Sequence, residues 1–266
     1  MNDRILTLAR EHAPCYLYEY DVMQRQVETL RQTFPRYDLL YSIKANPFPP
    51  VVRALAGLGL GADAASAPEV LLSRKCGMDR TDIFFSAAGK SDAALEAAWD
   101  EGEIIADSLG EVVRIGALCE KKGQHRAIGV RINPAFGMGG AAGGSSKFGI
   151  NEEDLPRLKA LLDTLPVTVK GIHVHLKSQN LDADVLGGCC RDSWALAKRV
   201  RDALECEMRY VNFGSGVGVA YDEAFEQPMA LERLRTYTDA IAADNDATLK
   251  ARLMIETGRF PTAQAG

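Results

Sequence analysis

The sequence predicts an α/β fold, and a (β/α)8 TIM barrel is the architecture that we expect. Eight short apolar runs rich in strand formers alternate with helix-like segments between residues 38 and 256. Such alternation is typical of parallel strands joined by crossover helices. The 266 residues suffice for a barrel, since this fold commonly needs about 250 residues. An open doubly wound sheet is the alternative.

The expected elements follow one another in a regular order. Strands are expected at 38–43, 60–65, 82–86, 103–106, 127–132, 169–175, 208–213 and 252–256, with helices near 47–57, 67–77, 91–101, 108–122, 151–164, 183–206 and 229–245. An aromatic strand at 15–20 and a helix at 21–34 precede them. Residues 1–24 are therefore expected to form an N-terminal strand segment ahead of a barrel over residues 25–266.

The composition limits the function classes. The net charge is -5 with no long run of either sign, which argues against a nucleic-acid or membrane surface. The first residues lack the apolar core of a secretion signal, and no stretch approaches the roughly 18 to 20 apolar residues that span a bilayer. We expect a cytoplasmic protein with reduced cysteines that acts on a small molecule.

Polar residues end most of the predicted strands. In a barrel the carboxyl ends of the strands carry the chemistry. A purely structural barrel has little reason to place polar groups there, so the pattern predicts an active site built from several strands. The strand-end residues are Lys44, Asp63 with Ser66, Ser86, Asp107, Arg131 with Asn133, His175, Gly214 to Gly218, and Glu256 to Arg259.

Lys44 is the candidate nucleophile. It follows the apolar strand 38–43 and precedes Asn46-Pro47, where proline disfavours helical geometry. A free lysine amine titrates near about 10.4, and we expect partial burial to lower that pKa. An amine of this kind forms an imine with an aldehyde. An exposed strand-end cation is the alternative interpretation.

Gly214-Ser-Gly-Val-Gly218 follows a predicted strand and favours phosphate binding. Glycines allow close backbone approach to an anion, and their amide groups form a nest. Alone, the motif also serves as a plain turn. Its place at the seventh strand end favours phosphate, which barrels often bind there.

His173 and His175 point to one side of their strand because side chains alternate. A metal site is one alternative. No acidic or cysteine ligand accompanies the pair in its motif, and a flat imidazole can stack on a planar cofactor. We favour stacking by one histidine and a structural role for the other, with no metal.

Glu256-Thr-Gly-Arg259 places a carboxylate and a guanidinium at the eighth strand end. A simple ion pair is an equally good explanation for these two residues alone. If a pyridine ring lies across the barrel mouth, Glu256 could keep its nitrogen protonated while Arg259 or the nearby backbone binds a phosphate. The ring would then be a strong electron sink.

Several fragments, taken together, resemble the fold-type III PLP-dependent decarboxylases, the group of diaminopimelate, ornithine and arginine decarboxylases. The likeness is greatest to the diaminopimelate decarboxylases and runs from about Pro14 to Gly266. The fragments are Tyr41-Ser-Ile-Lys-Ala-Asn46, Gly61-Ala-Asp-Ala-Ala-Ser-Ala-Pro-Glu69, Arg131-Ile-Asn-Pro134, Ser146-Lys-Phe-Gly149, Gly171-Ile-His-Val-His-Leu-Lys-Ser-Gln179, Gly214-Ser-Gly216 and Glu256-Thr-Gly-Arg259.

The resemblance implies an alanine racemase-like barrel that binds pyridoxal 5'-phosphate as a Schiff base on Lys44. His175 would stack on the ring, and Glu256 would meet its nitrogen. The phosphate would be surrounded by Ser178, Gly214, Ser215, Gly216 and Arg259, while Asp63, Glu69 and Arg131 would support the lysine and the ring.

The chain also departs from the family pattern. Lys177, Ser215 and Thr257 stand where the family usually has glycine, glycine and proline. Lys177 could meet a substrate carboxylate or could simply point outward. Family members continue into a C-terminal β-domain, which we expect to be absent here and to be the missing partner of the N-terminal strand. The resemblance implies a homodimer in the full-length form.

The expected function is decarboxylation of an amino acid, diaminopimelate or another diamino acid, through Lys44, His175 and Glu256. Racemisation is a weaker alternative, because racemases of this fold type place an arginine at the ring nitrogen. A non-catalytic protein of pyridoxal phosphate homeostasis is an alternative from another class.

Overall fold

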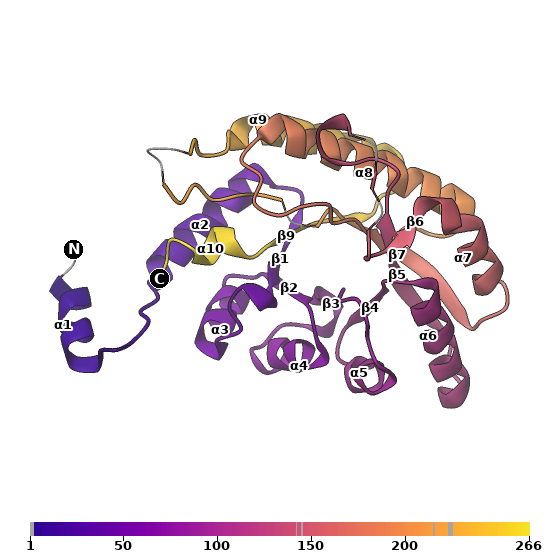
Figure 1. Ribbon diagram of the computed structural model, residues 1–266, viewed down its shortest axis with the longest axis horizontal. Helices are drawn as coiled ribbons and strands as arrows, with labels where there is room; N and C mark the ends of the chain where they lie inside the picture. Colours follow the sequence, from indigo (N-terminus) through magenta and orange to yellow (C-terminus); the bar gives the residue numbers. More distant parts are fainter. Residues whose placement is uncertain (1–2, 142, 145, 215, 223–225) are drawn as a thin grey trace.

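Eight parallel strands close into a barrel within the described residues 3–141, 143–144, 146–214, 216–222 and 226–266 of the computed structural model (Figure 1). The strand order is β4-β3-β2-β1-β9-β8-β7-β5, and β4 also pairs with β5. The barrel prediction is thus confirmed. The strands are β1 (Asp38–Ser42), β2 (Gly61–Ala64), β3 (Ile83–Phe85), β4 (Glu103–Ala106), β5 (Arg126–Asn133), β7 (Val167–His173), β8 (Tyr210–Asn212) and β9 (Arg252–Thr257).

Helices surround the barrel in the predicted order. Several begin at a serine whose hydroxyl accepts a bond from the amide three residues on, as Ser108 does from Glu111 N at 3.2 Å. The two-residue strand β6 (Ile150–Asn151) pairs only with β5. The helices are α1 (Asp3–His12), α2 (Tyr20–Thr33), α3 (Pro49–Gly57), α4 (Ala67–Lys75), α5 (Asp92–Ala98), α6 (Leu109–Lys122), α7 (Leu155–Leu162), α8 (Ala183–Leu204), α9 (Leu231–Ala247) and α10 (Arg259–Thr262).

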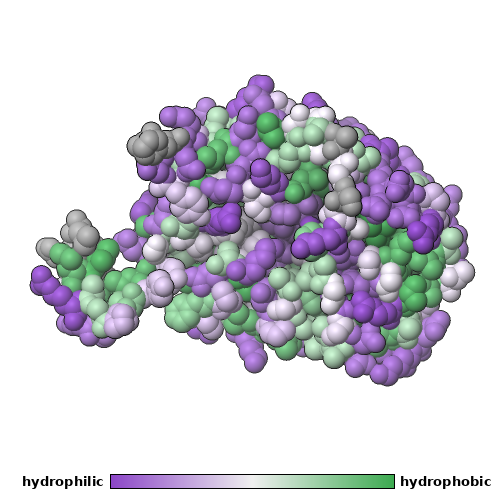
Figure 2. All heavy atoms as spheres, viewed as in Figure 1, coloured by the Kyte–Doolittle hydropathy of each residue, from purple (hydrophilic) through white to green (hydrophobic). Residues whose placement is uncertain are grey.

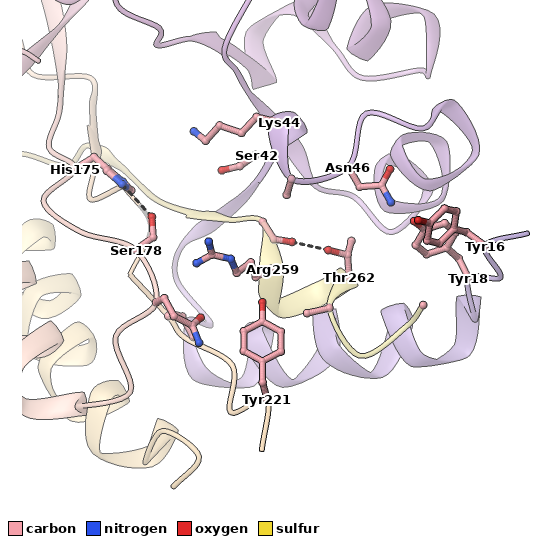
Figure 3. A pocket seen from close by; sticks show the side chains of 16 residues that line it. Tyr16, Tyr18, Ser42, Lys44, Asn46, His175, Ser178, Tyr221, Arg259 and Thr262 are labelled. Atoms are coloured by element: carbon pink, nitrogen blue, oxygen red, sulfur yellow. Dashed lines mark hydrogen bonds between the residues drawn. The ribbon is translucent and has the colours of Figure 1, made fainter. Parts of the chain in front are cut away.

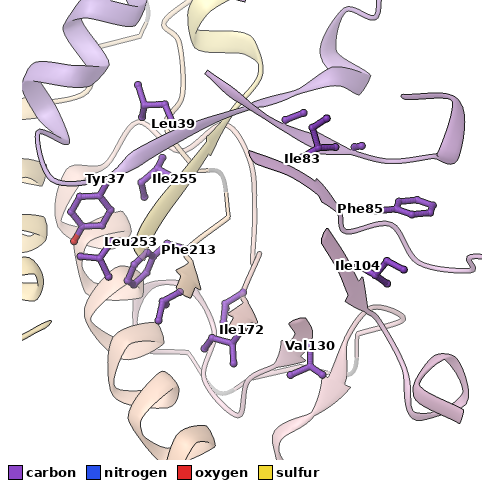
Figure 4. Packing of buried hydrophobic residues seen from close by; sticks show 14 of the residues in the cluster. Tyr37, Leu39, Ile83, Phe85, Ile104, Val130, Ile172, Phe213, Leu253 and Ile255 are labelled. Carbon is purple, nitrogen blue, oxygen red and sulfur yellow. The ribbon is translucent and has the colours of Figure 1, made fainter. Parts of the chain in front are cut away.

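The core has two layers because strand side chains alternate between the barrel axis and the helices. The outer layer lies between strands and helices and includes Leu39, Ile83, Phe85, Ile104 and Ile255 (Figure 4). The inner layer is a separate cluster on the axis, formed by Leu40, Phe84, Ile105, Tyr210 and Met254. Both layers are closely packed, and they fix the positions of the strand ends.

Replacing Tyr210 by phenylalanine is expected to raise the free energy of unfolding by about 1 kcal/mol. The Tyr210 hydroxyl is buried on the barrel axis with no hydrogen-bond partner among the described residues. An unsatisfied buried hydroxyl costs about 1 to 3 kcal/mol. Urea unfolding measures the change. Tyr37→Phe is the control and should destabilise the chain, because the Tyr37 hydroxyl donates to Thr238 O at 2.9 Å. A loss of stability in Tyr210→Phe would contradict the expectation.

The N-terminal segment differs from its prediction. The strand expected at 15–20 is wrong: residues 13–19 form neither helix nor strand, and Tyr20 already begins α2. Tyr16 is 89% exposed, so this stretch lacks the two-sided packing of a barrel strand. Helix α1, which the sequence analysis missed, projects from the body, and hydrophobic side chains show on it (Figures 1 and 2). In the described part of the chain no helix is long and apolar enough to cross a bilayer.

Candidate active site

One cavity of about 640 Å³ opens at the carboxyl ends of the strands. Lys44, His175, Ser178 and Arg259 line it, and Figure 3 shows Lys44 and His175 on two sides of the same space. Tyr16, Tyr18 and Tyr221 also line it. A cavity of this size accommodates a cofactor together with a small substrate. Four of the predicted site residues, from three different segments, therefore share one cavity.

The Lys44 amine is held by Asp63. Lys44 lies in the short 3-10 helix η1 (Ile43–Ala45) directly after β1, and its Nζ is 2.9 Å from Asp63 Oδ2. Burial lowers the pKa of Lys44, but the carboxylates of Asp63 and Glu256 outweigh it, so the pKa is raised above 10.5. The expectation of a lowered pKa is wrong for this chain without cofactor. The amine is an ammonium at neutral pH.

Asp63 is a fully buried carboxylate with three side-chain donors. Besides Lys44, Ser42 Oγ donates to Oδ2 at 2.9 Å, and Ser86 Oγ donates to Oδ1. β1, β2 and β3 are neighbours, so their ends bring these residues together. Ser42 was missed from the sequence because a serine within a strand carries no signal of its own. Glu69 instead accepts from Ala65 N at 2.7 Å.

Glu256, His173 and His175 form a buried cluster on β9 and the end of β7. His173 Nε2 lies 3.2 Å from Glu256 Oε1, and His175 Nδ1 lies 3.9 Å from Glu256 Oε2. Burial raises the pKa of Glu256, but His173, His175 and Lys44 lower it more, so the pKa falls well below its usual range. Glu256 is therefore a carboxylate that is 1% exposed.

Asn212 connects this carboxylate to the glycine motif. Its Nδ2 donates to Glu256 Oε1 at 2.9 Å, and its Oδ1 accepts from Gly214 N at 2.9 Å. Asn212 is fully buried at the end of β8. The sequence analysis missed this residue, although it also ends a predicted strand. A single amide side chain thus fixes two predicted site residues relative to each other.

Two glycines of the motif are packed tightly against neighbouring protein atoms, so a side chain would clash at either position. Gly214 has φ of 67°, and a Cβ there would lie 2.5 Å from Val174 O and 2.9 Å from His175 Nδ1. A Cβ at Gly216 would lie 2.4 Å from a methyl group of Leu186. Ser215, predicted beside the phosphate, lies outside the described residues. Arg259 begins α10 and lines the cavity, and the described residues offer it no ion pair.

Arg131 and Lys177 lie outside the cavity lining. Arg131 NH1 is 3.5 Å from Asp107 Oδ1, and its guanidinium lies 4.8 Å from the ring centre of Phe148. Burial raises the pKa of Asp107, against the pull of Arg131. Lys177 is exposed and lines a different, much smaller hollow. Of the two alternatives for Lys177, this exposed position favours the one in which the side chain points outward.

The fold brings an acidic residue to the two histidines, so a metal site stays an alternative. The sequence motif of the two histidines contains no acidic ligand. Glu256, which follows His175 by 81 residues in the chain, supplies one in the folded protein. The donor atoms of His173, His175 and Glu256 all lie within 4.8 Å of one another. The set can therefore hold either a cation or the polar edge of a planar cofactor.

The stability of the chain is expected to fall between pH 6.5 and about 4 because of His175. Burial lowers the pKa of His175 from 6.5 to about 4, against the pull of Glu256. The unfolded chain binds this proton near pH 6.5 and the folded chain does not, so stability present above pH 6.5 is lost as pH falls toward about 4. Within this window the free energy of unfolding should change by up to about 1.4 kcal/mol per pH unit, which is the effect of one bound proton.

Urea unfolding at several pH values measures this slope. His175→Gln should flatten it across that window. His125→Gln, at an exposed position, is the control and should leave it unchanged. Equal slopes in wild type and His175→Gln would refute the assignment.

Comparisons with known proteins show the family of this chain. The family model described as "Pyridoxal-dependent decarboxylase, pyridoxal binding domain" matches residues 20–263. L-glutamyl-[BtrI acyl-carrier protein] decarboxylase of Niallia circulans is 31% identical, covering 96% of this chain and 62% of the relative. Diaminopimelate decarboxylase of Aquifex aeolicus is 26% identical, covering 95% and 61%. The chain thus spans about three fifths of the length of these curated relatives.

Solved structures show the same fold. Diaminopimelate decarboxylase from Helicobacter pylori complexed with L-lysine superposes with a TM-score of 0.86 at 24% identity, covering 99% of this chain and 68% of that one. The lysine/ornithine decarboxylase complexed with cadaverine from Vibrio vulnificus gives a TM-score of 0.81 at 21% identity, covering 99% and 66%. With the match over residues 20–263, the chain belongs to the pyridoxal-dependent decarboxylases, as a pyridoxal binding domain.

Proposed function

We propose that the protein decarboxylates an amino acid with pyridoxal phosphate bound in the 640 Å³ cavity. The observation that carries the proposal is the common placement of Lys44, His175, Ser178 and Arg259 around that cavity, with the ionised Glu256 carboxylate beside His175. An amine, a flat ring, a guanidinium and a buried carboxylate are the groups that a phosphorylated pyridine aldehyde requires.

The residues fit this cofactor. Arg259 and Ser178 line the cavity and would offer a phosphate a charge and a hydroxyl, and the backbone amides of the glycine motif could add further donors. Lys44 would hold the aldehyde carbon, and His175 would lie against the ring. Asp63, with Arg131 farther away, would support the lysine and the ring. Ser215 is proposed at the phosphate from its place in the motif alone.

When bound, the cofactor supplies an electron sink for the bond that breaks at the α-carbon. Glu256 would hold a proton at the pyridine nitrogen, which requires a carboxylate that stays ionised, as the lowered pKa of Glu256 provides. Asn212 fixes the orientation of this carboxylate through its 2.9 Å bond. Asp63 keeps Lys44 pointed into the cavity and shares its charge.

The proposed substrate is a diamino acid. Relatives of this chain carry the name diaminopimelate decarboxylase, and similar folds were solved with L-lysine or cadaverine. A carrier-linked glutamyl group is the second candidate, favoured by the 31% identical relative of that name. A racemase is less well supported because Glu256, a carboxylate, would meet the ring nitrogen. A non-catalytic role is less well supported because the relatives are named as decarboxylases.

The wider organisation is also a proposal. We infer a cytoplasmic homodimer for the full-length form, supported by the family resemblance. The division of the chain into a segment of residues 1–24 and a barrel domain of residues 25–266 stays a prediction. The pairing of the first segment with a further β-domain also stays a prediction. Sedimentation of the full-length protein tests the dimer.

Absorbance with pyridoxal phosphate, before and after borohydride, tests the cofactor site. Borohydride is expected to fix a pyridoxyl group on Lys44 of the wild type, located by peptide mass, and Lys44→Ala should lose both this label and the protein-bound absorbance band. Lys75→Ala, at an exposed position on α4, is the matched control. Labelling of other lysines to the same extent in Lys44→Ala would overturn the proposal. Release of carbon dioxide from diaminopimelate, lysine and ornithine then tests the activity.

A further inference from the structure

His173 is a buried side chain whose hydrogen-bonding capacity is unused. It is 2% exposed, and neither Nδ1 nor Nε2 makes a hydrogen bond with the described residues. The 3.2 Å contact of Nε2 with Glu256 Oε1 lacks hydrogen-bond geometry. Leaving a buried polar group unsatisfied costs about 1 to 3 kcal/mol. Unlike the Tyr210 hydroxyl in its apolar cluster, His173 lies beside a second histidine and a carboxylate, where a bound ligand could satisfy it.

The surroundings of His173 match the ligand set of a transition metal. Two ligands of a tetrahedral Zn²⁺, each at about 2.0 to 2.1 Å, lie about 3.3 Å apart. His173 Nε2 and Glu256 Oε1 are 3.2 Å apart, close to that value. His175 Nδ1 is 3.9 Å from Glu256 Oε2. One ligand atom from each of the three residues can be chosen so that all three atoms lie within 4.8 Å of one another. Binding of one ion by all three ligands would require the spread of up to 4.8 Å between their donor atoms to close toward about 3.3 Å.

Outer contacts already orient these ligands. Asn212 Nδ2 donates to Glu256 Oε1 at 2.9 Å, and Ser178 Oγ lies 3.4 Å from His175 Nε2. Metal-binding histidines and carboxylates usually have such partners. His175 lines the open cavity, which supplies an entry path and a direction for a fourth ligand such as water.

We propose that the cofactor-free protein binds one Zn²⁺-like ion through His173, His175 and Glu256. We further infer that this ion and pyridoxal phosphate exclude each other. The exclusion rests on the proposed function, in which His175 and Glu256 would contact the cofactor ring. Metal binding itself rests only on the three side chains.

Lys44 opposes the ion. Its ammonium interacts electrostatically with both Glu256 and His175. Asp63 neutralises part of this charge through the 2.9 Å contact, and Arg131 is engaged with Asp107. Removing the Lys44 ammonium should therefore strengthen metal binding while it weakens cofactor binding. These opposite changes separate the two ligands.

Calorimetric titration of cofactor-free protein with Zn²⁺ tests the site, in a Cys15→Ser background because Cys15 is an exposed thiol. One equivalent is expected to bind. Binding should weaken at least about tenfold in His173→Gln and in His175→Gln. His125→Gln, at an exposed histidine, should bind as the wild type does. Circular dichroism identifies a variant that does not fold, and the other histidine variant then decides.

Each outcome has one meaning. Absence of a stoichiometric site, or binding as tight as in the wild type in both site variants, overturns the metal site. Tighter Zn²⁺ binding in Lys44→Ala supports the opposing role of the ammonium, and weaker binding refutes that role. Zn²⁺ binding to protein already saturated with pyridoxal phosphate overturns the exclusion. Failure of the borohydride labelling of Lys44 would refute the cofactor proposal and leave the Zn²⁺ titration unaffected.

Discussion

Replacing Lys90 by methionine is expected to lower the free energy of unfolding by about 3 to 5 kcal/mol. The Lys90 amine is fully buried, 2.9 Å from Glu111 Oε2, and it also donates to Ile105 O at 2.7 Å and to Ala87 O. Burial lowers the pKa of Lys90, against the pull of Glu111. Methionine fills a similar volume but leaves the Glu111 carboxylate, which is 1% exposed, without its main counterion.

Urea unfolding of both proteins at neutral pH measures this loss. Lys121→Met is the matched control, because Lys121 Nζ lies 2.6 Å from Glu96 Oε1 in an exposed pair. Exposed pairs contribute about 0 to 1 kcal/mol, so the control should change little. Similar losses in the two variants would show that the burial of the Lys90 pair has no special weight.

The pair of Lys90 and Glu111 is connected by hydrogen bonds and an ion pair to residues near the site. Glu111 Oε2 also accepts from Asp107 N at 2.9 Å, and Asp107 contacts Arg131. Lys90→Met should therefore loosen the ends of β4 and β5 as well as lower the global stability. Hydrogen exchange at these strand ends, compared between wild type and Lys90→Met, reports this local effect.

Replacing Glu256 by glutamine is expected to lower the proposed decarboxylation rate at least about 100-fold. Glutamine keeps the shape, and its amide oxygen can still accept from Asn212 Nδ2, which now donates to Glu256 Oε1 at 2.9 Å. It cannot act as the anion that holds a proton on the ring nitrogen. The change therefore removes a charge and leaves the packing in place.

Carbon dioxide release with a saturating diamino acid measures the effect. Absorbance after borohydride should show that Glu256→Gln still carries pyridoxal phosphate on Lys44. Glu101→Gln is the control, since Glu101 pairs with Arg74 on the surface, away from the cavity. An unchanged rate in Glu256→Gln would show that this carboxylate does not serve the ring nitrogen.

The sequence determined the barrel and four of the polar residues that line the cavity. Strand and helix periodicity are local properties, so the eight strands and the helices from α2 to α9 fall where the pattern places them. Since the parallel strands end at one face, Lys44, His175 and Arg259 could be grouped without coordinates. The N-terminal stretch shows the limit of this reasoning: its aromatic alternation predicted a strand, but a strand needs a neighbouring edge to pair with, and residues 13–19 form no strand.

Only the tertiary structure decided how the polar groups interact. Distances between residues far apart in sequence set the raised pKa of Lys44, the lowered pKa of Glu256 and the bridge from Asn212 to Gly214. It also brought Glu256 to the two histidines, which makes a cation site available. Electrostatic energy depends on separation and burial, and the order of residues along the chain specifies neither. The sequence thus specifies which chemical groups lie at the barrel mouth, and the packing of the barrel determines their charges and partners.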